Sequence, residues 1–449
     1  MSNLGTQLRN AWSAVRSSYW FVPSIMLLAS VLLSFLMHFF DATVDPQRLE
    51  KLPWIYINQP DGARALLSTV AGSMITVAGV TFSVTIVALS LASSQYGPRV
   101  LRNFMSDTGN QLVLGTFVAT FMYCLLILRT VQGGDESTFV PHLSIVLAVV
   151  LAAVSLGVLI YFVHHTAGRI QIENLLASVA RDLGQATIKM FPAGLGQDLA
   201  EEKVNLPEDF EEQAVHVSNK TDGYVQDIDK RLFNLAVRHD LFIYLECRPG
   251  DFVVQGKTLL RAWPKKRLGK ALLAKMESLL IIGSHRSQAQ DLAFLFDQLV
   301  EVALLALSPG VNEPYTAVMC IDRIEAGLCM LAKREVPSAY RCDDKARLRM
   351  VAFPLSLTEA VVMTLAAIRR DASNNLMVTL RLLRAVETVG DFTANEKHRQ
   401  VLLEEASNIL VSAQASLSVA GDREAVERAY HRTLRALDPQ GQRDKEDSL

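Results

Sequence analysis

The sequence predicts a mainly α-helical membrane protein: a four-helix transmembrane region followed by a small β module and a cytoplasmic helical domain. Three observations predict this fold class. Four apolar stretches lie within residues 20–164, each about as long as the roughly 20 residues that cross a bilayer as a helix. Apolar and polar residues alternate within residues 213–264, as they do in strands. Apolar residues then recur at helical spacing within residues 265–437.

Composition agrees with a membrane protein in a reducing compartment. Half of the 449 residues are hydrophobic, and the mean hydropathy is +0.22. The formal net charge of −2 gives no indication of a nucleic-acid partner. The five cysteines form no C-x-x-C pair, which argues against a zinc site and against a disulfide framework.

The first membrane span is expected from about Trp20 to Phe40, after a cytoplasmic N-terminal tail of residues 1–19. The stretch is about as long as a true span and longer than the core of a signal peptide, and no small-x-small cleavage site follows it. We therefore expect this segment to be retained in the mature protein.

The second span, from Leu66 to Ser94, carries no charge and is unusually rich in hydroxyl groups. At about 100° per residue, six of these groups share an arc of roughly 100° on one side of the helix. They are Thr69, Ser73, Thr76, Ser83, Ser90 and Ser94, with Gly72 and Gly79 at the edge of the arc. We call these eight residues the hydroxyl stripe.

Two interpretations of the hydroxyl stripe stay open. Small residues let neighbouring helices approach closely, and hydroxyl groups bond across helices or back to carbonyls of their own helix. Alternatively, the stripe lines a wetted pathway through the membrane. Thr85 lies about 160° from Thr69 on the same helical wheel and so falls outside the stripe.

The connection after the second span carries two arginines. Gly97-Pro98 ends the helix, because proline disfavours helix in the residue before it, and Arg99 and Arg102 then lie at the membrane surface. They are expected to anchor the cytoplasmic side of the span, or else to form a basic ring at a pore mouth or a contact for acidic headgroups.

The third span is expected from Leu112 to Val131 and the fourth from Pro141 to about Val163. The GGDES turn between them holds no Lys or Arg, and short loops of this kind usually lie outside the cell. Both termini are then cytoplasmic, in a bacterial inner membrane. Residues 165–212 are expected to form a membrane-proximal amphipathic helix and a linker.

The β module of residues 213–264 contains two half-motifs, SNKTDGYVQDID and CRPGDFVVQGKTLL. Their spacing resembles the barrel-sandwich fold of biotinyl and lipoyl carrier domains. The carrier lysine flanked by methionines is missing from these motifs. We therefore expect a structural or docking module without a covalent cofactor.

The helical domain of residues 265–437 is followed by a tail of residues 438–449, which is expected to be disordered. The stretch from Gln288 to Leu307 is apolar nearly all round, with a few acids, and is expected to be a buried helix.

A short motif follows this buried helix. Ser308, Pro309 and Gly310 end it, and Asn312 is expected to cap the next helix with Pro314 in its first turn. The free N–H groups at this helix start could receive an anion, although a capped helix junction is the simpler interpretation.

Two motifs, SQYGPRVLRNF after the second span and ALSPGVNEPYTA in the helical domain, resemble a bacterial family of predicted membrane proteins, domain-of-unknown-function family 2254. The resemblance covers nearly the whole chain. It implies an inner-membrane protein with an N-terminal membrane region and a cytoplasmic C-terminal region. It brings no activity and no catalytic residues.

Motifs of enzyme chemistry are absent from the sequence: it has no Walker loop, no nucleophile elbow and no H-E-x-x-H. Four acids could hold a divalent cation, but acids on amphipathic helices are more often solvated or salt-bridged, so no metal site is assigned. They are Asp297, Glu301, Glu313 and Asp322. We therefore expect a protein that is not an enzyme and has no cofactor.

The favoured function is an oligomeric channel for ions or small solutes, in which the second spans of several copies surround a pathway and the cytoplasmic part gates or assembles it. A proton-coupled or ion-coupled carrier would usually bury an ionisable group in the membrane, and none lies deep in these spans. The expected partners are the lipid bilayer and further copies of the chain. The alternative is a membrane-anchored interaction or sensory protein without transport activity.

Overall fold

The computed structural model describes residues 20–43, 59–96, 108–133, 139–169, 172–190, 197–198, 206–287, 291–333 and 339–438. The chain forms two compact units, residues 1–174 and 175–449. Arg99, Arg102, the N-terminal tail and the residues after Asp438 lie outside the described ranges.

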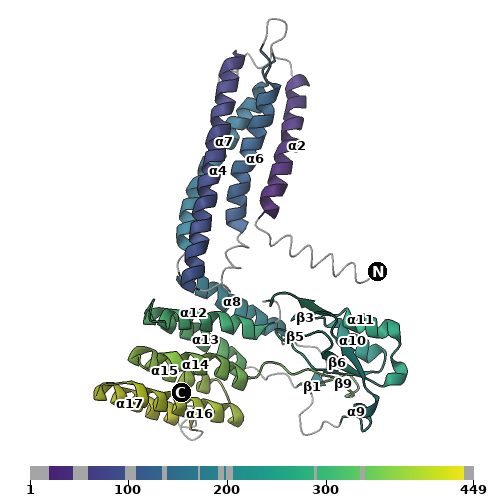
Figure 1. Cartoon of the computed structure of the whole chain (residues 1–449), viewed down its shortest axis with the longest axis vertical. Coiled ribbons are helices and arrows are strands. Elements are labelled where there is room, and N and C mark those ends of the chain that lie inside the picture. The colour runs from purple at the N-terminus through teal and green to yellow at the C-terminus, as the bar shows by residue number, and fades with distance from the viewer. Residues whose placement is uncertain are drawn as a thin grey trace. The chain divides into compact units, whose positions relative to one another are not determined.

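The first unit contains four long helices that lie side by side (Figure 1). They are α2 (Phe21–Thr43), α4 (Pro60–Tyr96), α6 (Thr108–Thr130) and α7 (His142–Arg169). By length and composition, each is able to cross a membrane, which confirms the predicted four-helix transmembrane region. Large apolar side chains on their outer faces are exposed, such as Leu32 of α2 at 73% and Ile160 of α7 at 67%, as expected for faces that meet lipid.

Helix α6 is the centre of this bundle. It packs against α2, α4 and α7, and half of its membrane-spanning window is buried, against 11–22% in the other three helices. Gly115 permits a close approach of α2 to α6. A Cβ atom at this position would lie 2.5 Å from Sδ of Met26 and 3.3 Å from Cα of Pro23, both in α2.

Several polar groups inside the bundle are paired across helices. The carboxylate of Asp41, near the end of α2, accepts hydrogen bonds from the backbone N–H groups of Leu143 and Ser144 in the first turn of α7. The hydroxyl of Tyr123 in α6 donates to the carbonyl oxygen of Ser144 at 3.1 Å. These bonds tie three helices together and satisfy groups that would be costly to leave unpaired in a bilayer.

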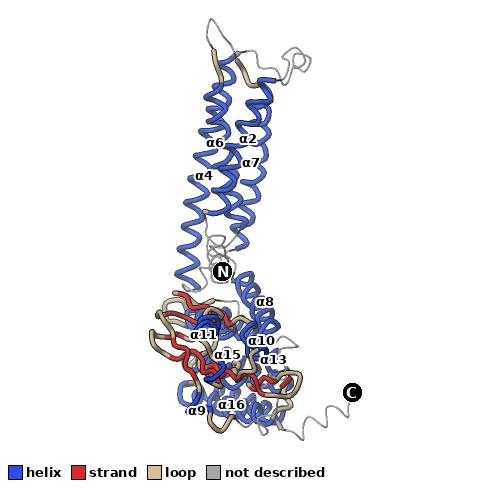
Figure 2. The backbone as a smooth tube through the Cα atoms, turned by 90° about the vertical axis from the view of Figure 1, so that its right-hand side faces the viewer, coloured by secondary structure: helices blue, strands red, loops and turns tan. Residues whose placement is uncertain are grey.

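The second unit contains two small sheets, drawn in red in Figure 2. The larger has the strand order β1-β8-β9-β4-β6-β2 and the smaller β5-β3-β7. All strand pairs are antiparallel except β4 with β9. The strands are β1 (Gln197–Asp198), β2 (Val215–Ser218), β3 (Gly223–Ile228), β4 (Phe242–Leu245), β5 (Phe252–Val253), β6 (Thr258–Trp263), β7 (Leu280–Gly283), β8 (Tyr340–Cys342) and β9 (Leu348–Val351).

One apolar core serves both sheets and two short helices, α10 (Arg231–Arg238) and α11 (Lys270–Glu277). Leu232 of α10 and Met276 of α11 are fully buried in it beside Ile243 of β4. A third short helix, α9 (Phe210–Gln213), places Phe210 against Phe242 with their ring centroids 5.0 Å apart.

The predicted limits of the β module were too narrow. Strands β7, β8 and β9 lie after residue 264, where the sequence predicted only helices, while β1 and all but the last residue of α9 lie within the predicted linker. The four-residue run of β7 is too short to distinguish a strand from a buried helical turn. Strand β9 joins the sheet by pairing with β4, which is about 100 residues away, and hydrophobic periodicity does not reveal such distant pairs.

Three stacked helix pairs make up the rest of the second unit (Figure 1). Helix α12 packs on α13 and α14, α13 on α15, α14 on α16, and α15 on α17, which is the arrangement of an α-solenoid. The helices are α12 (Leu292–Leu307), α13 (Pro314–Lys333), α14 (Leu357–Ala372), α15 (Leu376–Asp391), α16 (Glu396–Ser416) and α17 (Ala420–Leu437). The expected buried helix is α12.

Helix α8 (Ile172–Met190) covers one end of this stack. Its predicted apolar residues Leu175, Leu176, Val179 and Leu183 are buried, as an amphipathic helix requires. Leu183 lies against Gly327 of α13, where any larger side chain would collide with it.

The sheets and the helix stack are joined by ion pairs. Arg248 of the β module contacts both carboxylate oxygens of Glu359, at 3.0 and 3.1 Å, in the first turn of α14. Asp291 accepts from the N–H of Phe294 at the start of α12 and pairs with Arg286. Gly250 adopts a φ of +99° beside Asp291, and a Cβ there would overlap this carboxylate.

Candidate functional site

The two sides of α4 differ in burial. One side packs on α6 and α7 and contains Ala63, Leu67, Ala71, Ala78 and Thr81, all buried. These residues recur at helical spacing, so they define a single inward face.

The hydroxyl stripe lies on the other side of α4. Thr69, Ser73, Thr76, Ser83 and Ser90 are all exposed, roughly 180° around the helix from the inward face. A Cβ at Gly72 or Gly79 would meet no atom within 4 Å. Helix α4 includes Ser94, but the description of side chains ends before it.

Four hydroxyl groups of the hydroxyl stripe donate hydrogen bonds to carbonyl oxygens of α4 itself. Thr69 donates to Ala65, Ser73 to Thr69, Thr76 to Gly72 and Ser83 to Gly79, at 2.7–2.9 Å. A hydroxyl has one donor and two acceptor lone pairs, so these oxygens keep acceptor capacity after the donor is used. The stripe therefore presents acceptors on the outer surface of the chain.

Thr85 occupies the inward half of the helix. It is half-buried, and its hydroxyl donates to the carbonyl of Thr81, a residue that is 3% exposed. A substitution at Thr85 thus probes contacts within the chain, whereas one at Thr76 probes the outer face.

The motif of residues 308–314 forms the turn between α12 and α13. Ser308 ends α12, and the N–H of Glu313 returns to the carbonyl of Ala306 at 2.8 Å. The expectation that Asn312 caps α13 is wrong. Asn312 has a left-handed φ of +51°, and Glu313 lies between it and the first helical residue, Pro314.

The tip of this turn is exposed. Tyr315 is 76% exposed and Val311 39%, while Pro309 and Gly310 are also on the surface. Tyrosine is enriched at protein–protein interfaces relative to the rest of the protein surface.

The comparisons with known proteins agree with the described fold. The profile of a family of predicted membrane proteins, domain-of-unknown-function family 2254, matches residues 16–388. The chain belongs to this family. The matched range includes all four membrane-spanning helices and every strand, and it ends within α15.

Uncharacterised proteins of Mycobacterium bovis and Mycobacterium tuberculosis are similar to this family member. Each is 31% identical over 390 residues, which cover 85% of this chain and 74% of the relative. No solved structure matches the chain.

The acids considered as metal ligands take part in other interactions. Asp297 pairs with Arg286 at 2.6 Å, Asp322 pairs with Arg381 at 2.6 Å, and Glu313 accepts from the hydroxyl of Thr316. Within the described residues, no three His, Cys, Asp or Glu side chains are placed to hold one ion.

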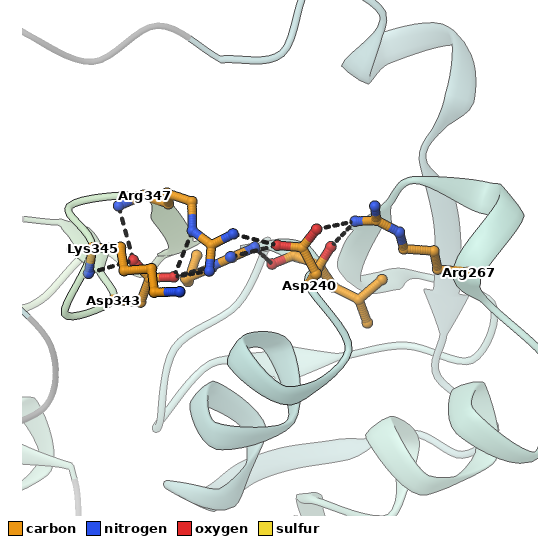
Figure 3. Close-up of polar contacts among 7 residues, drawn as sticks. Asp240, Arg267, Asp343, Lys345 and Arg347 are labelled. Carbon is orange, nitrogen blue, oxygen red and sulfur yellow. Dashed lines mark hydrogen bonds and ion pairs between the residues drawn. The ribbon is translucent and has the colours of Figure 1, made fainter.

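One cluster of charged side chains was not predicted from the sequence (Figure 3). Asp240, in a left-handed conformation with a φ of +51°, accepts hydrogen bonds from Arg267, Arg347 and Arg349. Asp343 accepts from the side chains of Arg347 and Arg349 at 3.0 and 2.9 Å. The turn between β8 and β9 thereby comes to lie beside the end of α10.

Burial and hydrogen bonding act in opposite directions on Asp343, which is 5% exposed. Burial alone would raise the pKa of its carboxyl group. The backbone N–H of Arg347 and the guanidinium groups of Arg349 and Arg347 outweigh burial and hold the pKa well below its usual range. The carboxylate is therefore charged at neutral pH, beneath a surface that is rich in cations.

No short-range spacing predicted the centre of this cluster, because Asp240 and its partners Arg347 and Arg349 are more than 100 residues apart in sequence. A local indication is the acidic pair Asp343-Asp344 followed by three basic residues up to position 349, which is as typical of a solvated loop.

Proposed function

We propose that this membrane protein is an oligomeric channel in which the α4 helices of several copies surround a pathway. One observation carries the proposal: the hydroxyl stripe lies on the outer face of α4, away from the face that packs on α6 and α7. Gly72 and Gly79 leave space there for a second helix. Oligomerisation would place several stripes around one axis.

The chemistry of the stripe favours cations, or neutral solutes that donate hydrogen bonds. Four of its hydroxyl donors, those of Thr69, Ser73, Thr76 and Ser83, are engaged within α4, so this part of the pathway would present oxygen lone pairs. Residues 65–96 contain no charged side chain, whereas a coupled carrier would usually hold an ionisable group at this depth. A channel is therefore the better proposal.

Conductance in a planar bilayer tests this function. Ser83→Leu adds bulk to the stripe and removes a hydroxyl, so the current per protein should fall by at least about tenfold if the pathway narrows to one side chain. Thr76→Val removes only a hydroxyl from the same face and should reduce the current less.

Thr85→Val is the matched control, because it removes a hydroxyl from the inward face and should leave the current unchanged. Equal losses from Thr76→Val and Thr85→Val would contradict a pathway along the stripe. Light scattering of the purified protein provides an independent check, since a strictly monomeric chain would exclude a pathway formed between copies.

We also propose that both termini are cytoplasmic. A cysteine introduced at Ser137, in the GGDES turn, should react with an impermeant thiol reagent in intact cells, whereas one at Gln213 should react only after lysis. Cys247, Cys320 and Cys342 are buried, and burial raises the pKa of the Cys247 thiol to about 12, which keeps their background reaction low. The reverse labelling pattern would invert the topology.

A second candidate function is a membrane-anchored interaction protein. It is favoured by the exposed tip between α12 and α13, where Val311 and Tyr315 project from the helix stack. Stacked helix pairs commonly present binding surfaces of this kind. If the wild-type protein is oligomeric but carries no current in a planar bilayer, this second candidate function is favoured. Neither function is enzymatic.

A further inference from the structure

A basic surface surrounds Asp240 in the second unit. It is formed by the end of α10, by the short 3-10 helix of residues 265–267 and by the turn between β8 and β9. Figure 3 shows Lys345, Arg347 and Arg267 arranged along Asp343 and Asp240. We define the basic surface as Arg238, Lys265, Lys266, Arg267, Lys345 and Arg347, all of them exposed.

The two acids hold this surface in shape. Asp240 binds Arg267 on one side and Arg347 on the other, so that segments about 80 residues apart in sequence lie together. Asp343 accepts from the N–H groups of Lys345 and Arg347 and fixes the turn that carries both residues. Each guanidinium retains N–H groups that face solvent, since Arg267 and Arg347 remain about half exposed at 49% and 50%.

Most of the basic surface is not neutralised. Across the described part of the chain, no hydrogen bond or ion pair involves the side chains of Arg238, Lys265, Lys266 or Lys345. Besides Asp240 and Asp343, the same segments contribute only one further carboxylate, that of Asp344. Positive charge is therefore in excess, and it is spread over an open face.

We propose that this basic surface binds the anionic headgroups of phospholipids. Unpaired lysines and arginines on an open face suit a fluid array of phosphates, and each contributes about 1 kcal/mol, or roughly fivefold, near an acidic bilayer. The second unit begins at residue 175, six residues after α7 ends at Arg169, so lipid is always present at high effective concentration. The proposal does not depend on conduction.

Lysine acetylation of the full-length protein in lipid nanodiscs tests the proposal. Lys265, Lys266 and Lys345 should react about fivefold more slowly in phosphatidylglycerol nanodiscs than in phosphatidylcholine nanodiscs, with Lys270 slowed as a neighbouring reporter. The exposed Lys397 of α16 should react equally in both. Salt at about 0.5 M should abolish the difference. Equal rates at the basic surface in the two lipids would overturn the proposal.

A charge-matched pair of variants separates the site from the overall charge. The substitutions K265Q, K266Q and K345Q together should remove the slowing at Lys270, and they should not affect folding because these side chains have no partners in the described structure. The substitutions R428Q, R432Q and R435Q remove the same charge from α17 and should leave the slowing intact. Loss of slowing in both variants would overturn the assignment.

Two added anions test the identity of the ligand. Neither inorganic phosphate nor a single-stranded oligonucleotide should slow acetylation of Lys265 or Lys345 in phosphatidylcholine nanodiscs. Slowing by phosphate would make the surface a general anion site, and slowing by the oligonucleotide would make it a nucleic-acid surface. Either result would overturn the lipid proposal.

Discussion

Asp343→Ala should destabilise the second unit by about 3–5 kcal/mol, because the substitution removes the buried carboxylate partner of Arg349 and leaves that buried guanidinium with Asp240 as its remaining partner. The Arg349 side chain is 6% exposed, and its Nε lies 2.9 Å from Asp343. The same change removes the acceptor that fixes the turn before β9. Urea unfolding in detergent, followed by pulse proteolysis, measures this loss.

Asp344→Ala is the matched control, since its carboxylate is exposed and adjacent in sequence. It should change the free energy of unfolding by less than about 0.5 kcal/mol. If the two variants lose equal stability, the buried ion pairs do not account for the effect.

The same pair of proteins should differ in their response to acid. The pKa of Asp343 is lowered in the folded protein, so its stabilisation is fully present above the unfolded value of about 3.9 and is lost as the pH falls below it. The difference in the free energy of unfolding between wild type and Asp343→Ala should therefore become smaller as the pH is lowered below about 3.9. A constant difference from pH 7 down to pH 3 would contradict this account.

Gly115→Leu should break the packing of α2 on α6. The flexible Sδ of Met26 can move aside, but Cα of Pro23, 3.3 Å from the new Cβ, can retreat only if α2 shifts as a whole. Overpacking of this kind costs about 1–3 kcal/mol or more, and we expect a large fall in the yield of monodisperse protein and in its melting temperature.

Gly157→Leu is the control for this prediction, because a Cβ at Gly157 of α7 meets no atom within 4 Å. It introduces the same side chain into a helix of the same bundle and should leave the melting temperature nearly unchanged. The melting temperature of Gly115→Ala should lie between those of Gly115→Leu and Gly157→Leu. A Gly157→Leu protein as unstable as Gly115→Leu would mean that helix propensity, not the contact with α2, is responsible.

Much of this fold follows from local patterns. Runs or helical periods of apolar residues predicted the four spans, the buried face of α8 and the buried helix α12. Each of these patterns can be recognised within a few helical turns of sequence. A helical-wheel projection of the sequence also predicted that the hydroxyl stripe lies on one side of the second span. In the structure the described residues of the stripe lie opposite the inward face of α4.

The remaining features depend on distant pairing. The β4–β9 pair and the cluster of Asp240 with Arg349 join segments about 100 residues apart, and no short-range spacing specifies them. Asn312 failed as a predicted cap because its φ of +51° suits a tight turn, which asparagine also favours.

The position of β9 has a consequence for synthesis. Strand β4 is complete at residue 245, but its parallel partner β9 begins only at residue 348, after the whole α12–α13 pair. At roughly 5–20 residues per second, a ribosome needs about 5–20 s to produce the intervening chain. Throughout that interval the nascent chain presents an open strand edge at Ile243 and Tyr244, the residues that β9 later covers. The α12–α13 pair is therefore synthesised while the sheet still lacks β9.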